Sequence, residues 1–110
     1  MCKKMKENFQ IEEFVNKNTV AGRNCGPEIK TATLFNSIIL QEWPNKELTE
    51  SIVSSSVVIK VEEIKVAGKI LSSLPMGTVG SLSLSGNSVE SLISEFKEIK
   101  KGQCLALVNV

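Results

Sequence analysis

A regular alternation of strand-like and helix-like segments in the second half of the chain constrains its fold more than any other feature. Residues 57–61 are a β-branched run typical of a buried strand, and residues 78–85 alternate serine with apolar side chains, as in a second strand. Residues 63–74, between these two, place apolar side chains at helical spacing. A helix over 89–99 and an apolar strand over 103–110 follow. Because strands joined by helices run parallel through right-handed crossovers, this order predicts an α/β fold, a three-layer α/β/α sandwich with a mainly parallel sheet.

The last predicted helix has signals at both of its ends. Asn87 is a suitable N-cap, and Glu90 stands three residues later, which is the spacing of a capping box. Lys100 and Lys101 suit the negative end of the helix dipole, and Gly102 supplies a left-handed stop. The apolar residues between these ends fall on one face, and they are Val89, Leu92, Ile93, Phe96 and Ile99. The strand that follows is almost continuously apolar, so we expect it to be central in the sheet.

We expect the first half of the chain to supply helices that cover the second face of the sheet. Apolar residues among lysine and glutamate over 3–16 predict a first helix, and a second helix is predicted over 27–43. The β-branched residues of this second segment would also suit a strand, but the apolar spacing favours a helix. A short helix is expected after Asn45. The length suits one core, so residues 1–110 are predicted to form a single domain, of which residues 1–26 are a peripheral helix and loop.

The composition removes several classes of chemistry. The chain contains no histidine, which excludes Ser-His-Asp and Cys-His catalysis and histidine-based zinc sites. Neither a glycine-rich nucleotide motif nor a Cys-x-x-Cys pair is present. The sequence therefore predicts no catalytic residues, no metal site and no cofactor, and a protein that is not an enzyme.

Charge and cysteine content indicate where such a protein works. Thirteen basic against twelve acidic residues leave a formal charge of +1, so any contact with nucleic acid must be a local patch. Three cysteines at wide spacing do not suggest a disulfide framework, which favours a reducing compartment. No signal peptide and no apolar run of about 20 residues are visible, so the predicted location is cytoplasmic, without membrane contact.

Two segments contain residue types that often occur at functional sites. Cys25 follows Arg23 and precedes a predicted helix, a position that favours a reactive thiol, but the sequence identifies no general base for it. A loop cysteine without a role is therefore the preferred interpretation, and Cys104 is expected in the core. Residues 85–88 place backbone N–H groups at a helix N-terminus, where α/β proteins bind ligands, although every capped helix has this arrangement.

Four further residues have ordinary structural explanations beside their functional ones. Glu62 and Glu63 follow a predicted strand, where α/β enzymes can hold catalytic acids, but a helix N-terminus also favours acidic residues. Phe35 and Trp43 have rings that stack well on nucleic-acid bases. Their shared helical face favours burial instead.

An order of apolar strand, helix, second strand, polar turn, helix and closing apolar strand spans about two-thirds of the chain, from Phe35 to Val110. Its segments are 57–61, 63–74, 78–85, 85–88, 89–99 and 104–108. This order resembles the α/β/α ribosomal proteins of the kink-turn-binding superfamily, although the Gly-x-Asn-Glu-x-x-Lys motif that reads RNA in that family is not present. The resemblance implies an α/β/α fold and a place in the ribosome. The same elements are similar to the STAS regulatory fold, without its Asp-Ser-Ser-Gly turn.

Two functional classes are expected. The first is a non-enzymatic structural or binding component of a ribonucleoprotein assembly such as the ribosome, in contact with RNA. The second is a STAS-like protein-binding regulatory module, switched by phosphorylation at Ser85 or Ser88. The residues predicted to bind RNA or a protein partner are Arg23, Asn24, Lys30, Ser85, Asn87, Ser88, Lys100 and Lys101.

Overall fold

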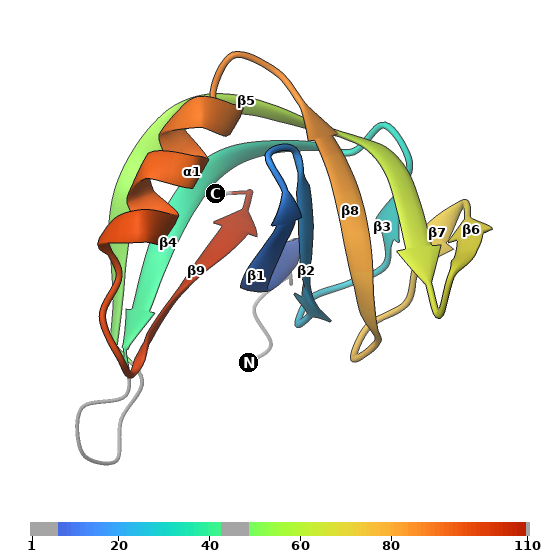
Figure 1. Ribbon diagram of the computed structural model, residues 1–110, viewed down its shortest axis with the longest axis horizontal. Helices are drawn as coiled ribbons and strands as arrows, with labels where there is room; N and C mark the ends of the chain where they lie inside the picture. The colour runs from blue at the N-terminus through green and yellow to red at the C-terminus, as the bar shows by residue number, and fades with distance from the viewer. Residues whose placement is uncertain (1–6, 43–48, 110) are drawn as a thin grey trace, which may run out of the picture.

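The computed structural model describes residues 7–42 and 49–109, and this part of the chain is built mainly from antiparallel strands (Figure 1). The elements are β1 (Asn8–Asn16), β2 (Thr19–Asn24), β3 (Ile29–Lys30), β4 (Leu34–Glu42), β5 (Thr49–Val66), β6 (Lys69–Leu71), β7 (Ser73–Leu74), β8 (Val79–Ser85), α1 (Val89–Glu98) and β9 (Gln103–Val108). Among the described strands, six close into a barrel in the order β4, β9, β1, β2, β8 and β5, because β4 and β5 also pair with each other. The short strand β6 pairs with the end of β5, and β3 pairs with β7 beside the barrel.

This barrel contradicts the predicted α/β/α sandwich with a parallel sheet, because every described strand pair is antiparallel. The helices predicted over 3–16, 27–43 and 63–74 are wrong, since strands occupy the described parts of these segments. The described residues of the segment 1–26 are not a peripheral helix and loop, because β1 and β2 are strands of the barrel. The predicted burial of Trp43 and the start of the short helix after Asn45 lie outside the described residues.

The later elements were predicted more accurately. The run 57–61 lies within β5, residues 79–85 form β8, and α1 covers most of the predicted helix 89–99. The predicted closing strand is β9, which lies between β4 and β1 in the closed barrel and not at the centre of a parallel sheet. The short helix expected after Asn45 is wrong from Thr49 onward, where β5 begins.

Beta-bulges explain why strands had the apolar spacing of helices. In β1 the register shifts between Ile11 and Glu13, so the next inward apolar residue after Ile11 is Phe14, three positions later. The same shift in β4 separates Phe35 from Ile38 by three positions. A third bulge in β5 likewise puts three positions between two inward apolar residues, Val61 and Ile64. In these bulged strands an extra residue in a two-residue repeat gives the three-residue step of a helix. The apolar spacing that predicted a helix over 63–74 instead runs from β5 across the turn at Ala67 and Gly68 into β6 and β7.

One apolar core fills the barrel, and strands from the whole barrel contribute to it. Its fully buried large side chains include Phe9, Ile11, Phe35, Ile38, Ile59, Ile64, Leu82, Leu84, Leu92, Leu105 and Leu107. The helix α1 adds Val89 and Leu92 to this core and packs Ile93 and Phe96 against it. Glu90 in its first turn and Lys97 in its last suit the helix dipole. No helix in the described ranges has the length and apolar character needed to cross a membrane.

Gly68 and Gly22 illustrate two ways in which the backbone requires glycine. Ala67 and Gly68 both have positive φ values, 52° and 82°, which is the conformation of a type I′ turn and joins β5 to β6. At Gly22 the strands β1 and β2 approach so closely that a Cβ atom would lie 1.9 Å from the main-chain oxygen of Gln10. Glycine is thus the residue that fits where β2 comes closest to the backbone of β1.

Candidate binding groove

Strands β1 and β9 pair along only part of their lengths. Their register stops at Ile11 and Leu105. Beyond this pair, within the described residues, β1 pairs only with β2, and Gln103 and Cys104 pair only with β4. The bulge after Ile11 redirects β1 where the two strands part. We call this opening the β1–β9 seam, and each strand has an edge there without a strand partner.

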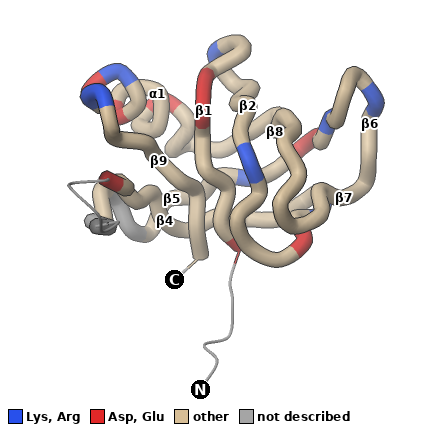
Figure 2. The backbone as a smooth tube through the Cα atoms, turned by 90° about the horizontal axis from the view of Figure 1, so that it is seen from below, with Lys and Arg blue, Asp and Glu red and all other residues tan. Residues whose placement is uncertain are grey.

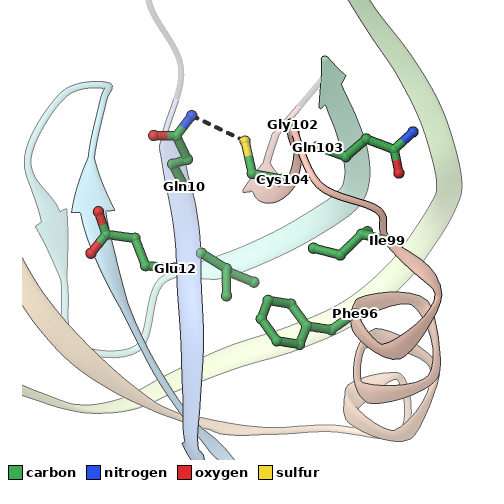
Figure 3. A pocket seen from close by; sticks show the side chains of 8 residues that line it. Gln10, Glu12, Phe96, Ile99, Gly102, Gln103 and Cys104 are labelled. Atoms are coloured by element: carbon green, nitrogen blue, oxygen red, sulfur yellow. Dashed lines mark hydrogen bonds between the residues drawn. The ribbon is translucent and has the colours of Figure 1, made fainter. Parts of the chain in front are cut away.

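A groove of about 400 Å³ lies in this seam (Figure 3). Its lining comes from β1, from the end of α1 and the residue after it, from the turn before β9 and from the start of β9. The lining residues are Gln10, Ile11, Glu12, Phe96, Ile99, Gly102, Gln103 and Cys104. The apolar members, Ile11, Phe96 and Ile99, belong to the core or pack against it. Ile11 is fully buried, whereas the other seven keep partial or full exposure, so this seam groove is open to solvent.

Two contacts hold the margins of the seam groove in place. Where β1 continues beyond the groove, Phe14 packs edge-on against Phe96 with ring centroids 5.1 Å apart, which fixes α1 against β1. On the opposite margin, the side-chain oxygen of Gln103 accepts a hydrogen bond from the backbone N–H of Lys100 at 2.8 Å. The backbone N–H of Gln103 donates to the carbonyl of Lys100 at 2.9 Å, and its side chain donates to Glu42. The turn before β9 is therefore preorganised.

A polar network joins three strands beside the seam groove. The amide nitrogen of Gln10 donates to the side-chain oxygen of Gln41 at 3.0 Å and to the sulfur of Cys104 at 3.3 Å. The Cys104 thiol is 3.7 Å from the same Gln41 oxygen and donates to it. Burial raises the pKa of Cys104, and the charge of Cys25 adds to this, whereas the hydrogen bond from Gln10 opposes it. Cys104 is thus a protonated thiol at neutral pH and not an activated nucleophile.

The predicted role of Asn24 in partner binding conflicts with where the structure places it. The side chain is fully buried. Its amide nitrogen donates to the carbonyls of Pro27 at 2.9 Å and Leu74 at 2.8 Å, and its oxygen accepts from the N–H of Gly26 at 3.0 Å. Asn24 therefore links the loop after β2 to β7, and both polar atoms of its side-chain amide are hydrogen-bonded within the protein.

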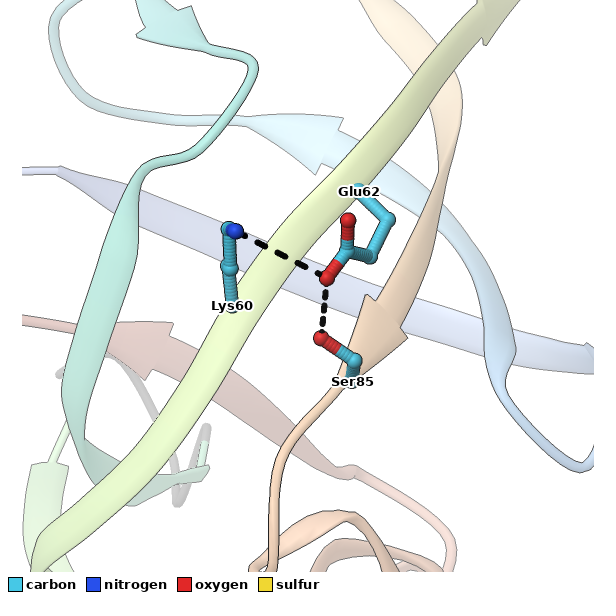
Figure 4. A network of polar contacts seen from close by, with 3 residues as sticks. All are labelled: Lys60, Glu62 and Ser85. Carbon is cyan, nitrogen blue, oxygen red and sulfur yellow. Dashed lines mark hydrogen bonds and ion pairs between the residues drawn. The ribbon is translucent and has the colours of Figure 1, made fainter.

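The segment 85–88 also forms internal contacts. Ser88 is the N-cap residue of α1 but makes no cap hydrogen bond, and its hydroxyl accepts from the backbone N–H of Val58 at 3.1 Å. The capping box expected from Asn87 is therefore absent from this helix start, and Asn87 is exposed. Ser85 donates to Glu62 at 2.5 Å, and Lys60 lies 3.9 Å from the same carboxylate oxygen (Figure 4).

The structural explanation offered for Glu62 and Glu63 was a helix N-terminus. It is wrong, because both residues lie in β5. Glu63 lies 3.6 Å from Lys65 and Glu62 contacts Ser85, so each carboxylate has a partner on the barrel surface. Phe35 is buried as expected, although from a strand and not from a helix face.

The predicted basic contacts come from separate parts of the fold. Arg23 lies on β2, Lys30 on β3, and Lys100 and Lys101 in the turn between α1 and β9. Figure 2 shows basic and acidic positions interspersed along the chain, with no basic face in this view. Of the predicted binding residues, Lys100 and Lys101 lie next to the seam groove because they precede Gly102, and Arg23 lies beside it because its register partner is Gln10.

Sequence reasoning missed the groove residues of β1, Gln10 and Glu12, because that segment was assigned to a helix. In the part of the chain that the structure covers, no group of three or more cysteine or acidic side chains could hold a metal ion. Comparisons with protein-family models, curated proteins and solved structures gave no match. The α/β/α fold implied by both resemblances is contradicted by the barrel, whereas the ribosomal role stays a prediction.

Proposed function

We propose that this protein is a non-catalytic protein-binding module that holds a short extended peptide segment of a partner in the seam groove. The observation that carries the proposal is the early end of β1–β9 pairing directly beside an apolar floor. A segment entering there would add its backbone to an unpaired strand edge and rest one apolar side chain on Phe96 and Ile99. Strand pairing would give the backbone groups of this edge protein partners in place of water, and the apolar contact would remove part of the floor from water.

The openness of the groove favours a peptide over a small molecule. A small-molecule site encloses most of its ligand, whereas seven of the eight lining residues here remain accessible. The stretch between the last β1–β9 pair at Ile11 and the ring contact of Phe14 is three residues, or roughly 10 Å of strand. This length suits two or three residues of extended backbone. We expect weak, reversible binding, with a Kd of roughly 10 µM to 1 mM.

The scattered basic residues give less support to RNA as the partner. Phosphate binding needs several cations on one surface, and Arg23, Lys30 and the Lys100–Lys101 pair come from three different places in the fold. We therefore favour the protein-partner class among the two expected from sequence. RNA binding is one of the alternative results that the experiment below can give.

The experiment selects random octapeptides on the immobilised full chain and measures their affinities by fluorescence anisotropy. Ile99→Asp places a charge on the apolar floor, and Ile70→Asp is the matched control because Ile70 on β6 is 66% exposed and does not line the groove. Both variants are first checked by thermal unfolding. We expect selected peptides to lose at least about tenfold in affinity with Ile99→Asp and to be unaffected by Ile70→Asp.

Backbone recognition has its own control. Methylating single peptide nitrogens should abolish binding at alternate positions, because a strand edge pairs with every second residue. Equal binding of a peptide to the two aspartate variants would place its site elsewhere and refute the proposal. Salt-sensitive binding of poly-uridine RNA without any groove-dependent peptide would favour the ribonucleoprotein class instead.

A further inference from the structure

We infer that the partner segment carries a lysine or arginine next to its apolar anchor, an inference that rests on the proposed function. The reason is the hydrogen-bonding character of the β1 margin. The side-chain nitrogen of Gln10 is engaged by Gln41 and Cys104, which leaves its oxygen available as an acceptor. Among the described residues, the carboxylate of Glu12 has no ion-pair or hydrogen-bond partner. Both available groups accept hydrogen bonds, so the matching partner group is a donor.

The position of these acceptors places the basic residue beside the anchor and not on the floor. Figure 3 shows the Gln10 oxygen and the Glu12 carboxylate on the side of β1 away from Phe96 and Ile99. A side chain that rests on the apolar floor therefore cannot reach them. A neighbouring residue of an extended segment points the other way and meets this margin. A long cationic side chain at that position can bring its charge to the Glu12 carboxylate.

Nearby charges set the size of the effect. Arg23 is the register partner of Gln10 on β2, and it makes no ion pair with Glu12 in the described residues. Lys100 and Lys101 stand on the opposite margin, next to Gly102, and repel a cation placed there. Arg23 also repels a cation on the β1 margin, so the favoured place for one positive charge is at the Glu12 carboxylate and not along the whole margin. Because Glu12 is exposed, the preference for a basic over a neutral residue is expected to be roughly two- to fivefold at low salt.

The test uses a matched pair of charge reversals. Glu12→Lys changes the charge of a groove residue, and Glu13→Lys makes the same change at the next position, which is exposed and does not line the groove. Octapeptides are selected on the wild-type chain and on each variant, and the residues next to the apolar anchor are counted. We expect enrichment of lysine and arginine on wild type and on Glu13→Lys, and enrichment of aspartate and glutamate on Glu12→Lys. Glu12→Gln, which removes the charge without reversing it, should show neither enrichment.

The possible failures of the two proposals are distinct. Groove-dependent peptides without basic enrichment, or identical changes with both lysine variants, would overturn the inference and leave the peptide-binding function standing. The absence of any peptide sensitive to Ile99→Asp would overturn both. Raising the salt concentration should reduce the charge preference while leaving the contribution of the apolar anchor.

Discussion

Replacing Asn24 with alanine should destabilise the whole protein, and the size of the effect can be derived from the structure. The side chain is fully buried and makes three hydrogen bonds to the backbone of Gly26, Pro27 and Leu74. Alanine would leave these three polar groups without their partner. At about 1 kcal/mol for each group, the expected loss is about 3 kcal/mol of unfolding free energy. For a domain of this size it lowers the melting temperature by about 12 °C.

The assay is urea and thermal unfolding followed by far-ultraviolet circular dichroism. Arg23→Ala is the matched control, because Arg23 is the preceding residue on β2 but is exposed, and the expected change is below about 0.5 kcal/mol. Asn24→Asp keeps an acceptor for the Gly26 N–H but directs a carboxylate at two carbonyl oxygens. It should be at least as destabilising as alanine at pH 7.

The reasoning would be refuted if Asn24→Ala unfolded within about 0.5 kcal/mol of the wild type. The buried amide would then contribute nothing beyond what water supplies in its place. A peptide-binding defect in a fully stable Asn24→Ala protein would support the role in partner binding that the sequence suggested, and would contradict the structural role assigned here.

Two other sites give predictions of their own. Gly22→Ala should lower the free energy of unfolding by more than about 3 kcal/mol or prevent folding, because the new Cβ would overlap the main-chain oxygen of Gln10. Wild-type stability of this variant in urea unfolding would contradict the close approach of β1 and β2. Since the folded protein holds the pKa of Cys104 above its ordinary value of 9.0, the unfolded thiol loses its proton first as the pH rises, and stability declines above about pH 9. Cys104→Ala should show a smaller decline between pH 8 and pH 10 in urea midpoints, and equal declines would disprove this linkage. A groove-bound peptide should slow alkylation of Cys104 but not of the exposed Cys25, as measured by mass spectrometry of the tryptic peptides that separate them; equal slowing at both would place the peptide elsewhere.

The elements predicted correctly are those in which local pattern and tertiary structure agree. The β-branched run 57–61, the alternation in β8 and the single apolar face of α1 have one interpretation each. The bulged strands have two interpretations, because the three positions between Ile11 and Phe14 are a spacing that apolar residues show both across a bulge and along a helix. The helix misassigned to 63–74 produced the alternating α/β order, and the helices misassigned to 3–16 and 27–43 supplied the cover for its second face. The positive φ values of Ala67 and Gly68 mark a turn inside the segment 63–74, for which the apolar spacing predicted a helix.

The groove could not be predicted because it depends on where two distant strands stop pairing. Gln10 and Cys104 are 94 positions apart, and nothing near either residue indicates that they meet. The burial of Asn24 is equally a tertiary property, since an asparagine in a glycine- and proline-rich loop is usually exposed. Lys100 and Lys101 were correctly placed after a helix. The groove beside them also depends on β1, and the sequence predicted a helix in place of that strand.

Nuclear Overhauser contacts between backbone protons of β1 and β9 test the central claim, an antiparallel barrel with an open seam, most directly. The structure predicts contacts between Phe9 and Leu107 and between Ile11 and Leu105, and none between Glu13 and Gln103. Contacts that continue to Glu13 and Gln103 would close the seam and remove the groove. The absence of the Phe9–Leu107 contact would contradict the barrel itself.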